Sequence, residues 1–273
     1  ISGLTDSVIV GSLGGINSGM NAYMLAMSST KHPLPLSAYE KGIKAISLGH
    51  RQTYNSVDSL TLLSPFGNAI TIAPNDPSIS ISEAFQQSSL RQSIMADTSV
   101  FGEDLKFGVQ NSSLTELYRP FFTLNPHLMQ EGELNFAEAI TSYIKVRKRR
   151  DNEIGVGSTN SDIWGFYQLN DSVGTYWINP AIAPSSMFMA KVSGIRSIKA
   201  LYEHYGDRLF TEYGFRAWLD LRNADVSDEF FALNQATMAV MIENARSGMI
   251  WNLYAAIPEI QRVQQQLFKP RDK

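Results

Sequence analysis

Apolar residues recur at helical spacing through most of the chain, with polar and helix-breaking residues between the runs. Met20, Tyr23, Met24 and Met27, for example, lie three or four positions apart or adjacent, so they would line one face of a helix. Similar patterns, with glycine or proline near their ends, predict further helices and a mainly α fold. The predicted helices cover residues 11–28, 37–49, 133–150, 193–204, 227–251 and 258–268.

Local signals predict where three of these helices begin or end. Ser37 and Glu40 match a capping box, and Ser227 followed by two acids would cap the helix that begins there. Gly206 would follow the C-terminus of the helix that ends at His204.

The stretch Asn234–Trp251 is apolar on nearly every face, yet it contains an Asn-Gln pair and a Glu-Asn-Ala-Arg cluster. A helix that is hydrophobic all round is usually buried. Carboxylate and guanidinium groups are rarely buried unless they are paired. These polar groups are therefore predicted either to have partners inside the fold or to hold a ligand.

A different pattern runs from about residue 52 to 130. Leu60–Leu63 and Ile70–Ile72 flank the turn sequence Pro65–Asn68, which predicts a β-hairpin. A serine-rich passage follows, with a helix expected near residues 83–95. This segment is interpreted as a β-containing insertion over residues 51–130.

A loop rich in Gly, Asn and Asp is predicted from Asp151 to Pro184. It carries several aromatic residues, among them Trp164, Tyr167 and Trp177. Long loops inside a domain are usually functional, and aromatic faces beside amide and carboxylate groups suit sugar rings. The alternative is that these aromatic side chains pack the loop onto the rest of the fold.

Composition limits the class of protein. Apolar residues make up 44% of the 273 residues and charged residues 18%, as in ordinary globular proteins. The net charge of −3 argues against a nucleic-acid partner, so the basic run Lys145–Arg150 is interpreted as a solvated helix end suited to the helix dipole. Nucleic-acid contact by this run is the alternative. No apolar run is long enough to span a bilayer.

Several chemistries find no support in the sequence. The chain has no cysteine, which excludes thiol catalysis and suits a periplasmic or secreted bacterial protein. Its four histidines lack metal-ligand spacing, and no phosphate-binding or dinucleotide fingerprint is present, so no metal and no cofactor are expected. Ser28–Lys31 fits the S-x-x-K signature of serine acyl transferases without its companion motifs, so this hypothesis is weak.

Three parts of the chain carry sequences that resemble one family. Ile16–Pro33 reads INSGMNAYMLAMSSTKHP, Trp164–Phe166, Ile182–Pro184 and Gly206–Phe215 read WGF, IAP and GDRLFTEYGF, and Asn234–Trp251 reads NQATMAVMIENARSGMIW. In this order they resemble Y-N-E-A-M…S-P-T-H-P, W-G-L…I-x-P…G-D-R-L-W-G-E-Y-G-F and D-Q-G-P-x-x-V-M-I-E-N-Y-R-S-G-L-L-W. These are motifs of the bacterial glycoamylase-like family, which includes endo-β-1,2-glucanases.

The resemblance implies an (α/α)6 toroid as a single domain over residues 1–273. The family's toroid has further helices before the first motif, so the resemblance implies an incomplete toroid. Either an N-terminal half has been lost or lies on another chain, or this homologue is short; a missing segment or a partner is expected to complete the fold. It also implies substrate-binding residues at the matching positions. These, together with the loop aromatics, are Asn17, Ser18, His32, Trp164, Tyr167, Trp177, Asn179, Tyr213, Asn234, Gln235 and Arg246.

The chain departs from the family at acidic positions. Ser18 stands where the family has a functionally important Glu, and Asn234 and Ala217 stand where it has Asp. A loop Asp of the family is matched by Asn179. Sugar hydrolysis would need such acids, so these departures weaken the expectation of activity.

Glycoside hydrolysis usually requires two carboxyl groups, one protonated and one ionised. The remaining candidates on family-like motifs are Glu243 and Asp171. Arg246 follows Glu243 at i+3, so an ion pair on one helix face is the competing interpretation of Glu243.

Two functions follow as hypotheses. The first is a glycoside hydrolase that acts on or binds β-linked glucan, with β-1,2-glucan as the linkage that the family suggests. The second is a catalytically inactive relative that binds glycan or serves as a scaffold.

Overall fold

The computed structural model describes residues 16–39, 47–54, 57–63, 69–72, 98–105, 114–131, 134–154, 160–166 and 177–268. The chain separates into two compact units, residues 1–98 with 106–112 and residues 99–105 with 113–273. Each unit is described by itself. The single domain over 1–273 and the insertion over 51–130 stay predictions, and the helix expected near 83–95 lies outside the described residues.

The first unit contains helix α1, Ile16–Ser28, as the apolar spacing predicts. Met20, Met24 and Met27 are buried on one face. The helix ends where expected, because Leu34 turns back and its N–H donates to the Ala26 carbonyl at 3.0 Å. A single turn of helix, α2, follows at Leu36–Tyr39.

The first unit also contains an antiparallel sheet of three strands in the order β1-β2-β3. The strands are β1 Ser47–Tyr54, β2 Val57–Leu63 and β3 Ala69–Ile72. Leu60 pairs with Ile72 and Leu63 with Ala69, which confirms the predicted hairpin. The predicted helix that ends at Gly49 is wrong over its last residues, because pairing with β2 draws Ser47 and Leu48 into a strand. Strand pairing is a tertiary effect that local apolar spacing does not report.

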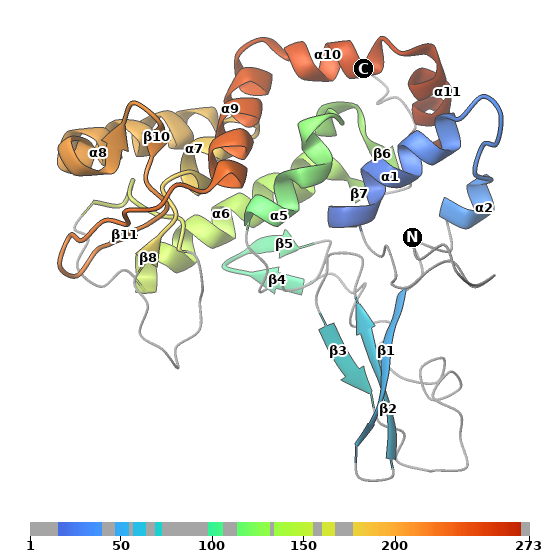
Figure 1. Ribbon diagram of the computed structural model, residues 1–273, viewed down its shortest axis with the longest axis horizontal. Helices are drawn as coiled ribbons and strands as arrows, with labels where there is room; N and C mark the ends of the chain where they lie inside the picture. Colours follow the sequence, from blue (N-terminus) through green and yellow to red (C-terminus); the bar gives the residue numbers. More distant parts are fainter. Residues whose placement is uncertain are drawn as a thin grey trace. The chain divides into compact units, whose positions relative to one another are not determined.

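The second unit is mainly helical, and short strands connect its helices (Figure 1). Two helices of nineteen residues each, α6 and α8, are its longest. Its helices are α5 Leu114–Tyr118, α6 Phe136–Ile154, α7 Ile182–Ser185, α8 Lys191–Leu209, α9 Ala232–Ser247, α10 Met249–Ala255 and α11 Pro258–Leu267, with 3-10 turns η2 Arg119–Phe122, η3 Pro126–Leu128 and η4 Ser186–Phe188. Its strands are β4 Thr98–Val100, β5 Glu103–Leu105, β6 Gln130–Glu131, β7 Leu134–Asn135, β8 Trp177–Ile178, β9 Phe210–Thr211, β10 Gly214–Phe215 and β11 Leu219–Asp220.

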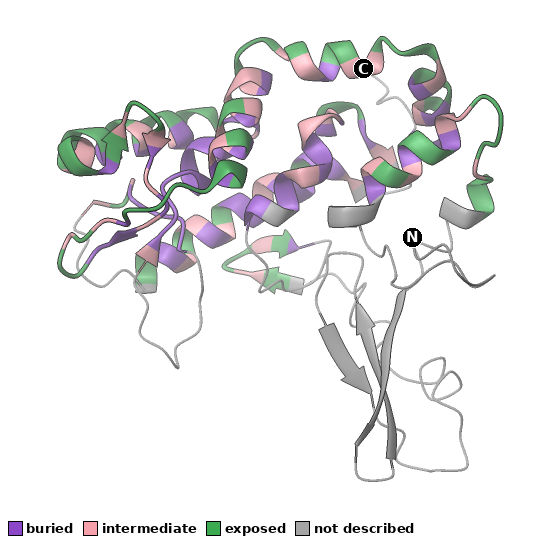
Figure 2. Ribbon diagram, viewed as in Figure 1, coloured by how far each residue is buried: buried purple, intermediate pink, exposed green. Residues whose placement is uncertain are grey.

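The core of the second unit has an aromatic part and an aliphatic part. Phe121 lies between Phe136 and Phe188, with ring centroids 6.5 and 6.3 Å away. The aliphatic part lies where the loops before β8 and β11 meet α8, and it includes Ile178 and Leu219, both fully buried. Figure 2 shows the buried residues concentrated on α6, α7 and the β8–β11 region.

The long helix predicted over Asn234–Trp251 is two helices. Gly248 has φ +67° and caps α9, because its N–H donates to the Asn244 carbonyl while α10 begins at the next residue. The prediction that this helix is buried on all faces is also wrong. Its buried stripe holds three polar residues and one methionine: Asn234, Thr237, Met241 and Asn244.

Other helix boundaries also differ from the predictions. Helix α2 begins at Leu36, so Ser37 lies inside it and does not cap it. Helix α6 begins at Phe136 and runs on to Ile154, so the basic run lies inside it and not at its end. Gly206 lies within α8 and does not follow it. Ser227 does not cap α9, which begins at Ala232; its Oγ accepts a hydrogen bond from the Glu229 N–H in the preceding turn. The last helix, α11, agrees with its prediction.

Within the described residues, no helix combines the length and apolar character that crossing a bilayer requires.

Candidate functional site

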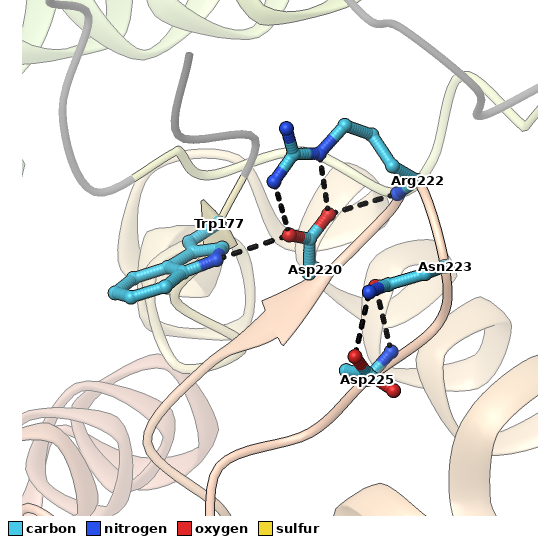
Figure 3. A network of polar contacts seen from close by, with 5 residues as sticks. All are labelled: Trp177, Asp220, Arg222, Asn223 and Asp225. Atoms are coloured by element: carbon cyan, nitrogen blue, oxygen red, sulfur yellow. Dashed lines mark hydrogen bonds and ion pairs between the residues drawn. The ribbon is translucent and has the colours of Figure 1, made fainter. Parts of the chain in front are cut away.

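Asp220 is the centre of a polar network in the second unit (Figure 3). Strands β8 and β11 pair antiparallel and place it opposite Trp177. The Trp177 indole Nε1 donates to Asp220 Oδ2 at 3.1 Å. Arg222 contacts the same carboxylate with Nε at 3.1 Å, Nη2 at 2.6 Å and its backbone N–H at 3.0 Å. The carboxylate therefore holds an indole and a guanidinium in fixed positions.

The next turn of the chain is fixed in a similar way. Asn223 Nδ2 donates to Asp225 Oδ2 at 2.6 Å, and the Asp225 N–H donates back to Asn223 Oδ1 at 3.2 Å. The Asp220 N–H donates to the Asp225 carbonyl at 2.8 Å. The turn thereby returns the chain beside β11.

Asp220 is held in its ionised form. The hydrogen bonds from Arg222 lower the pKa of its carboxyl below the usual range, against a smaller opposing effect of burial. A carboxylate with this pKa can accept hydrogen bonds at neutral pH but does not supply a proton.

A stacked pair of indole rings adjoins this network. The Trp177 and Trp218 rings lie parallel, 4.4 Å apart with an interplanar angle of 5°. Both side chains are half-buried, so each leaves part of its surface accessible. Flat aromatic surfaces beside fixed polar groups suit binding of a sugar ring.

An amide pair joins the loop after β8 to α9. Asn179 Nδ2 donates to Asn234 Oδ1 at 3.1 Å, and Asn179 Oδ1 accepts from the Ala181 N–H at 3.0 Å. Both asparagines are buried. The structure thus brings together two predicted substrate-binding residues, and each is used within the protein.

Gln235, next to Asn234, and Tyr213 are two further predicted substrate-binding residues. Gln235 Nε2 donates to the Phe215 carbonyl, which ties α9 to the β9–β10 hairpin. Tyr213, at the tip of that hairpin, is 70% exposed, and its ring meets Phe230 edge-on at 5.8 Å. Tyr213 is therefore available to a ligand.

Glu243 lies nine residues beyond Asn234 on α9, about 13 Å along the helix axis. Arg246 Nε and Nη2 donate to its two carboxylate oxygens at 2.8 and 2.9 Å, which confirms the pairing expected at i+3. Ser247 Oγ also donates to the carboxylate. The bonds from Arg246, then from Ser247, lower the Glu243 pKa. Its catalytic role stays a prediction; as placed, it is an ionised group and not a proton donor.

The other predicted residues are more dispersed. Trp164 is fully buried, and its Nε1 has no hydrogen-bond partner among the described residues. His32 is exposed, and its backbone N–H donates to Ser29 Oγ. Asn17 and Ser18 belong to α1, but their side chains lie outside the described part of the structure. Tyr167 and the second catalytic candidate, Asp171, lie outside the described residues. All of these assignments stay predictions.

Trp218, Asp220 and Arg222 were not predicted as site residues. A signal for them exists, because Trp218-Leu219-Asp220-Leu221-Arg222 alternates leucines with charged or aromatic side chains. Alternation of this kind is typical of a strand that is buried on one face. A run of five residues is too short for its spacing alone to distinguish a strand from a loop.

The remaining chemistries gain no support. Within the described residues, no group of three or more His, Asp or Glu side chains is placed to hold a metal ion. Ser28 Oγ, the serine of the S-x-x-K match, donates to the Leu25 carbonyl at 2.8 Å, as serines near helix ends commonly do.

Comparison with known proteins shows that this region is similar to one family. Residues 157–258 match the Glycoamylase family model, described as "Putative glucoamylase". The chain is 30% identical over 177 residues to the exo beta-1,2-glucooligosaccharide sophorohydrolase (non-reducing end) of Parabacteroides distasonis. That match covers 59% of this chain and 24% of the relative, so the chain spans about a quarter of its length.

Solved structures share the fold. A β-1,2-glucanase from Parabacteroides distasonis superposes with a TM-score of 0.70 at 23% identity, over 94% of this chain and 35% of that one. An endo-β-1,2-glucanase from Chitinophaga pinensis, solved with sophorotriose and glucose, gives 0.66 at 18% identity, over 90% and 52%. The predicted mainly α toroid fold is confirmed. Residues 157–258, the part of the chain that matches the Glycoamylase family model, contain the Trp177–Asp220–Arg222 network and the Asn179–Asn234 pair.

Proposed function

We propose that this chain is part of a glycoside hydrolase that acts on β-1,2-linked glucan, and that the Trp177–Trp218 stack with Asp220 and Arg222 binds sugar. The observation that carries the proposal is that this network lies inside the family-matched segment. The named relative is a sophorohydrolase of β-1,2-glucooligosaccharides, and two structures of the same fold are β-1,2-glucanases.

The carboxyl groups of the described residues are suited to sugar binding and less suited to proton transfer. Hydrogen bonds from a neighbouring arginine lower the pKa of both Asp220 and Glu243, so both carboxyl groups are ionised at neutral pH. Burial raises the pKa of Asp151, but this carboxyl is enclosed by Arg147 and two backbone N–H groups. We therefore keep Asp171 as the candidate for the protonated carboxyl that hydrolysis requires.

One observation favours the second candidate function, an inactive glycan-binding relative. Asn234 occupies a position where the family has Asp, and its Oδ1 accepts a hydrogen bond from Asn179 in a buried amide pair. An amide in this position cannot supply or take up a proton. Ser18 stands where the family has Glu, so a second acidic group of the family is replaced by a neutral side chain.

Two measurements on the whole protein separate these functions. The first is release of reducing ends from β-1,2-glucan, and the second is the dissociation constant for β-1,2-glucooligosaccharides. Turnover supports the hydrolase, binding without turnover supports the inactive relative, and absence of both rejects the proposal.

Two substitutions test the location of the sugar site. Trp218→Ala and Asp220→Asn are expected to weaken glucan binding at least tenfold, about 1.4 kcal/mol. Tyr202→Ala is the matched control, because Tyr202 is an exposed aromatic residue of α8 outside the network. Equal binding by all three variants would place the sugar elsewhere.

We also propose that a further segment or a second chain completes the fold. The support is that the chain spans 35–52% of the two solved structures described above. In addition, Val192, Ile195 and Tyr202 leave apolar surface exposed along α8. Light scattering on the purified 273-residue chain tests this proposal: a stable, monodisperse monomer would contradict it.

A periplasmic or secreted location is our final proposal, supported by the lack of cysteine in 273 residues. Fractionation of the native bacterium, with an antibody to the protein, would show it outside the cytoplasm. Recovery with cytoplasmic markers would overturn the proposal.

A further inference from the structure

Helix α6 contains a buried ion pair that lies outside the proposed sugar site. Arg147 Nε contacts Asp151 Oδ1 at 3.0 Å across one helical turn, and the two side chains are 8% and 0% exposed. A buried pair of this kind is weak evidence for stability, since the cost of desolvating two charges can exceed their attraction. Its presence therefore calls for another explanation.

Both members of the pair also bind a segment that lies further along the chain. Asp151 Oδ2 accepts the Gly165 N–H at 2.8 Å and the Phe166 N–H at 3.1 Å. Arg147 Nη2 donates to the Phe166 carbonyl at 2.5 Å. The pair thus satisfies three backbone groups of Gly165 and Phe166 and holds them against α6.

This anchored segment in turn holds the strand that carries Trp177. The Asn179 N–H donates to the Gly165 carbonyl at 2.9 Å, and Phe166 forms an antiparallel bridge with Ile178. Gly165 has φ +116°, and a Cβ there would lie 3.0 Å from Ile182 Cβ and 3.2 Å from the Asn179 carbonyl. The two segments are therefore in close backbone contact.

Hydrogen bonds continue from this point to both polar groups of the candidate site. Trp177 donates to Asp220, and Asn179 donates to Asn234. A continuous path of backbone and side-chain contacts leads from Asp151 through Gly165 and Asn179 to these residues.

We propose that Arg147 and Asp151 are positioning residues of the sugar site: they fix Gly165 and Phe166, and through them the orientation of Trp177 and Asn179. The effect on sugar binding rests on the proposed function. The anchoring of the loop does not, and it can be measured without a ligand.

Two variants of the whole protein test this proposal. Asp151→Asn keeps the shape of the side chain but removes its charge, and places an amide where two N–H groups and a guanidinium need acceptors. The double variant Arg147→Met with Asp151→Leu replaces the pair by apolar groups, a change that often leaves stability intact. Glu153→Gln is the matched control, because Arg149 and Glu153 form an i,i+4 pair on the same helix whose side chains are 60% and 54% exposed.

Amide hydrogen exchange of residues 160–166 and 177–179 is the first readout, and near-ultraviolet circular dichroism of the stacked Trp177–Trp218 rings is the second. Both Asp151 variants should exchange the Gly165 and Phe166 amides at least tenfold faster and lose part of the tryptophan signal. Glu153→Gln should leave both unchanged. If the double variant has the thermal stability of the native protein while its Gly165 and Phe166 amides still exchange faster, the pair positions these residues and does not simply stabilise the fold.

The third readout is binding of a β-1,2-glucooligosaccharide, which should weaken at least tenfold in both variants. If the enzyme turns over, KM should rise more than kcat falls. Failure of the native protein to bind glucan would reject the proposed function but leave the exchange result to decide the anchoring. Unchanged protection and dichroism, or failure of both variants to fold, would overturn the proposal.

Discussion

Asp220 shows how one buried carboxylate organises its surroundings. It accepts hydrogen bonds from Trp177 and from three N–H groups of Arg222, so its charge is matched where the chain turns after β11. The sequence predicted Trp177 as a sugar-binding residue, but it did not predict Asp220, its hydrogen-bond partner 43 residues later. Local spacing cannot report which carboxylate an indole N–H will reach across two strands.

The lowered pKa of Asp220 predicts a pH-dependent contribution to stability. Its folded pKa lies below the unfolded value of about 3.9, so the contribution is complete above that pH and is lost as pH falls through the folded pKa. Asp220→Asn should lower the free energy of unfolding by about 1–2 kcal/mol at pH 6, since Arg222 is half exposed and partly screened. Urea titrations at several pH values should show this difference shrinking below about pH 4.

The control for this prediction is Asp228→Asn. Asp228 also pairs with an arginine, Arg216, but its side chain is fully exposed. Its replacement should change the free energy of unfolding by less than about 0.5 kcal/mol. A constant deficit of Asp220→Asn from pH 6 to pH 2 would contradict the argument.

Gly165→Ala should destabilise the second unit by more than about 2 kcal/mol, because a left-handed φ costs about 1–3 kcal/mol and the new Cβ would crowd Ile182. Gly102→Ala separates these two effects, since Gly102 has φ +79° and a Cβ added there would meet nothing within 4 Å. We expect Gly102→Ala to cost only the backbone part, about 1 kcal/mol. Equal losses in chemical denaturation would show that crowding at Gly165 has no effect.

At the scale of elements, α9 and α10 show what the apolar pattern could not predict. The sequence predicts one helix that is buried all round, whereas Gly248 divides it and its buried stripe is mostly polar. For Asn244 and Trp251 the reason lies in η2. Asn244 Nδ2 donates to the Phe122 carbonyl at 3.0 Å and Trp251 Nε1 to the Phe121 carbonyl at 2.7 Å. Asn244 of this stripe and Trp251 of α10 thus donate to carbonyls more than 120 residues away in the sequence, whereas Asn234 pairs with Asn179.

The hydrogen bond from Trp251 to η2 predicts different outcomes for substitution of two aromatic residues of α10. Trp251→Phe removes the 2.7 Å donor to the Phe121 carbonyl and should cost about 1–3 kcal/mol, because this buried carbonyl keeps only the longer contact with Asn244 Nδ2 at 3.5 Å. Tyr254→Phe removes a buried hydroxyl that has no hydrogen-bond partner among the described residues. This change should therefore be neutral or slightly stabilising. Thermal unfolding followed by calorimetry compares them, and a larger loss for Tyr254→Phe would contradict the assignment of both groups.

For the whole molecule, the sequence predicted the fold class better than the details of the site. Helical spacing and the motif order gave the mainly α toroid, and the turn at Pro65–Asn68 gave the hairpin of β2 and β3. The helices and the hairpin depend on contacts between near neighbours in sequence, whereas the toroid was implied by the resemblance to the family. The contacts of Asp151 with Gly165 and of Asn179 with Asn234 depend on tertiary packing, so no local sequence pattern predicts them.

The arrangement of charge over the second unit predicts that the protein does not bind nucleic acid. Four of the five basic residues of its run on α6 form ion pairs within the protein. Its ion pairs join Lys145 to Glu103, Arg147 to Asp151, Lys148 to Asp162 and Arg149 to Glu153, at 3.0 to 3.4 Å.

Non-specific binding to DNA requires cations that are free to replace counterions on the phosphates, and the net charge of −3 opposes approach. Fluorescence anisotropy with a labelled duplex at about 50 mM salt should therefore show no binding at micromolar protein. A micromolar dissociation constant that rises steeply with salt and is lost in Lys145→Gln would contradict this prediction. It would mean that the exposed pair with Glu103 opens to admit a phosphate, since Lys145 is the most accessible of the lysines paired in this run.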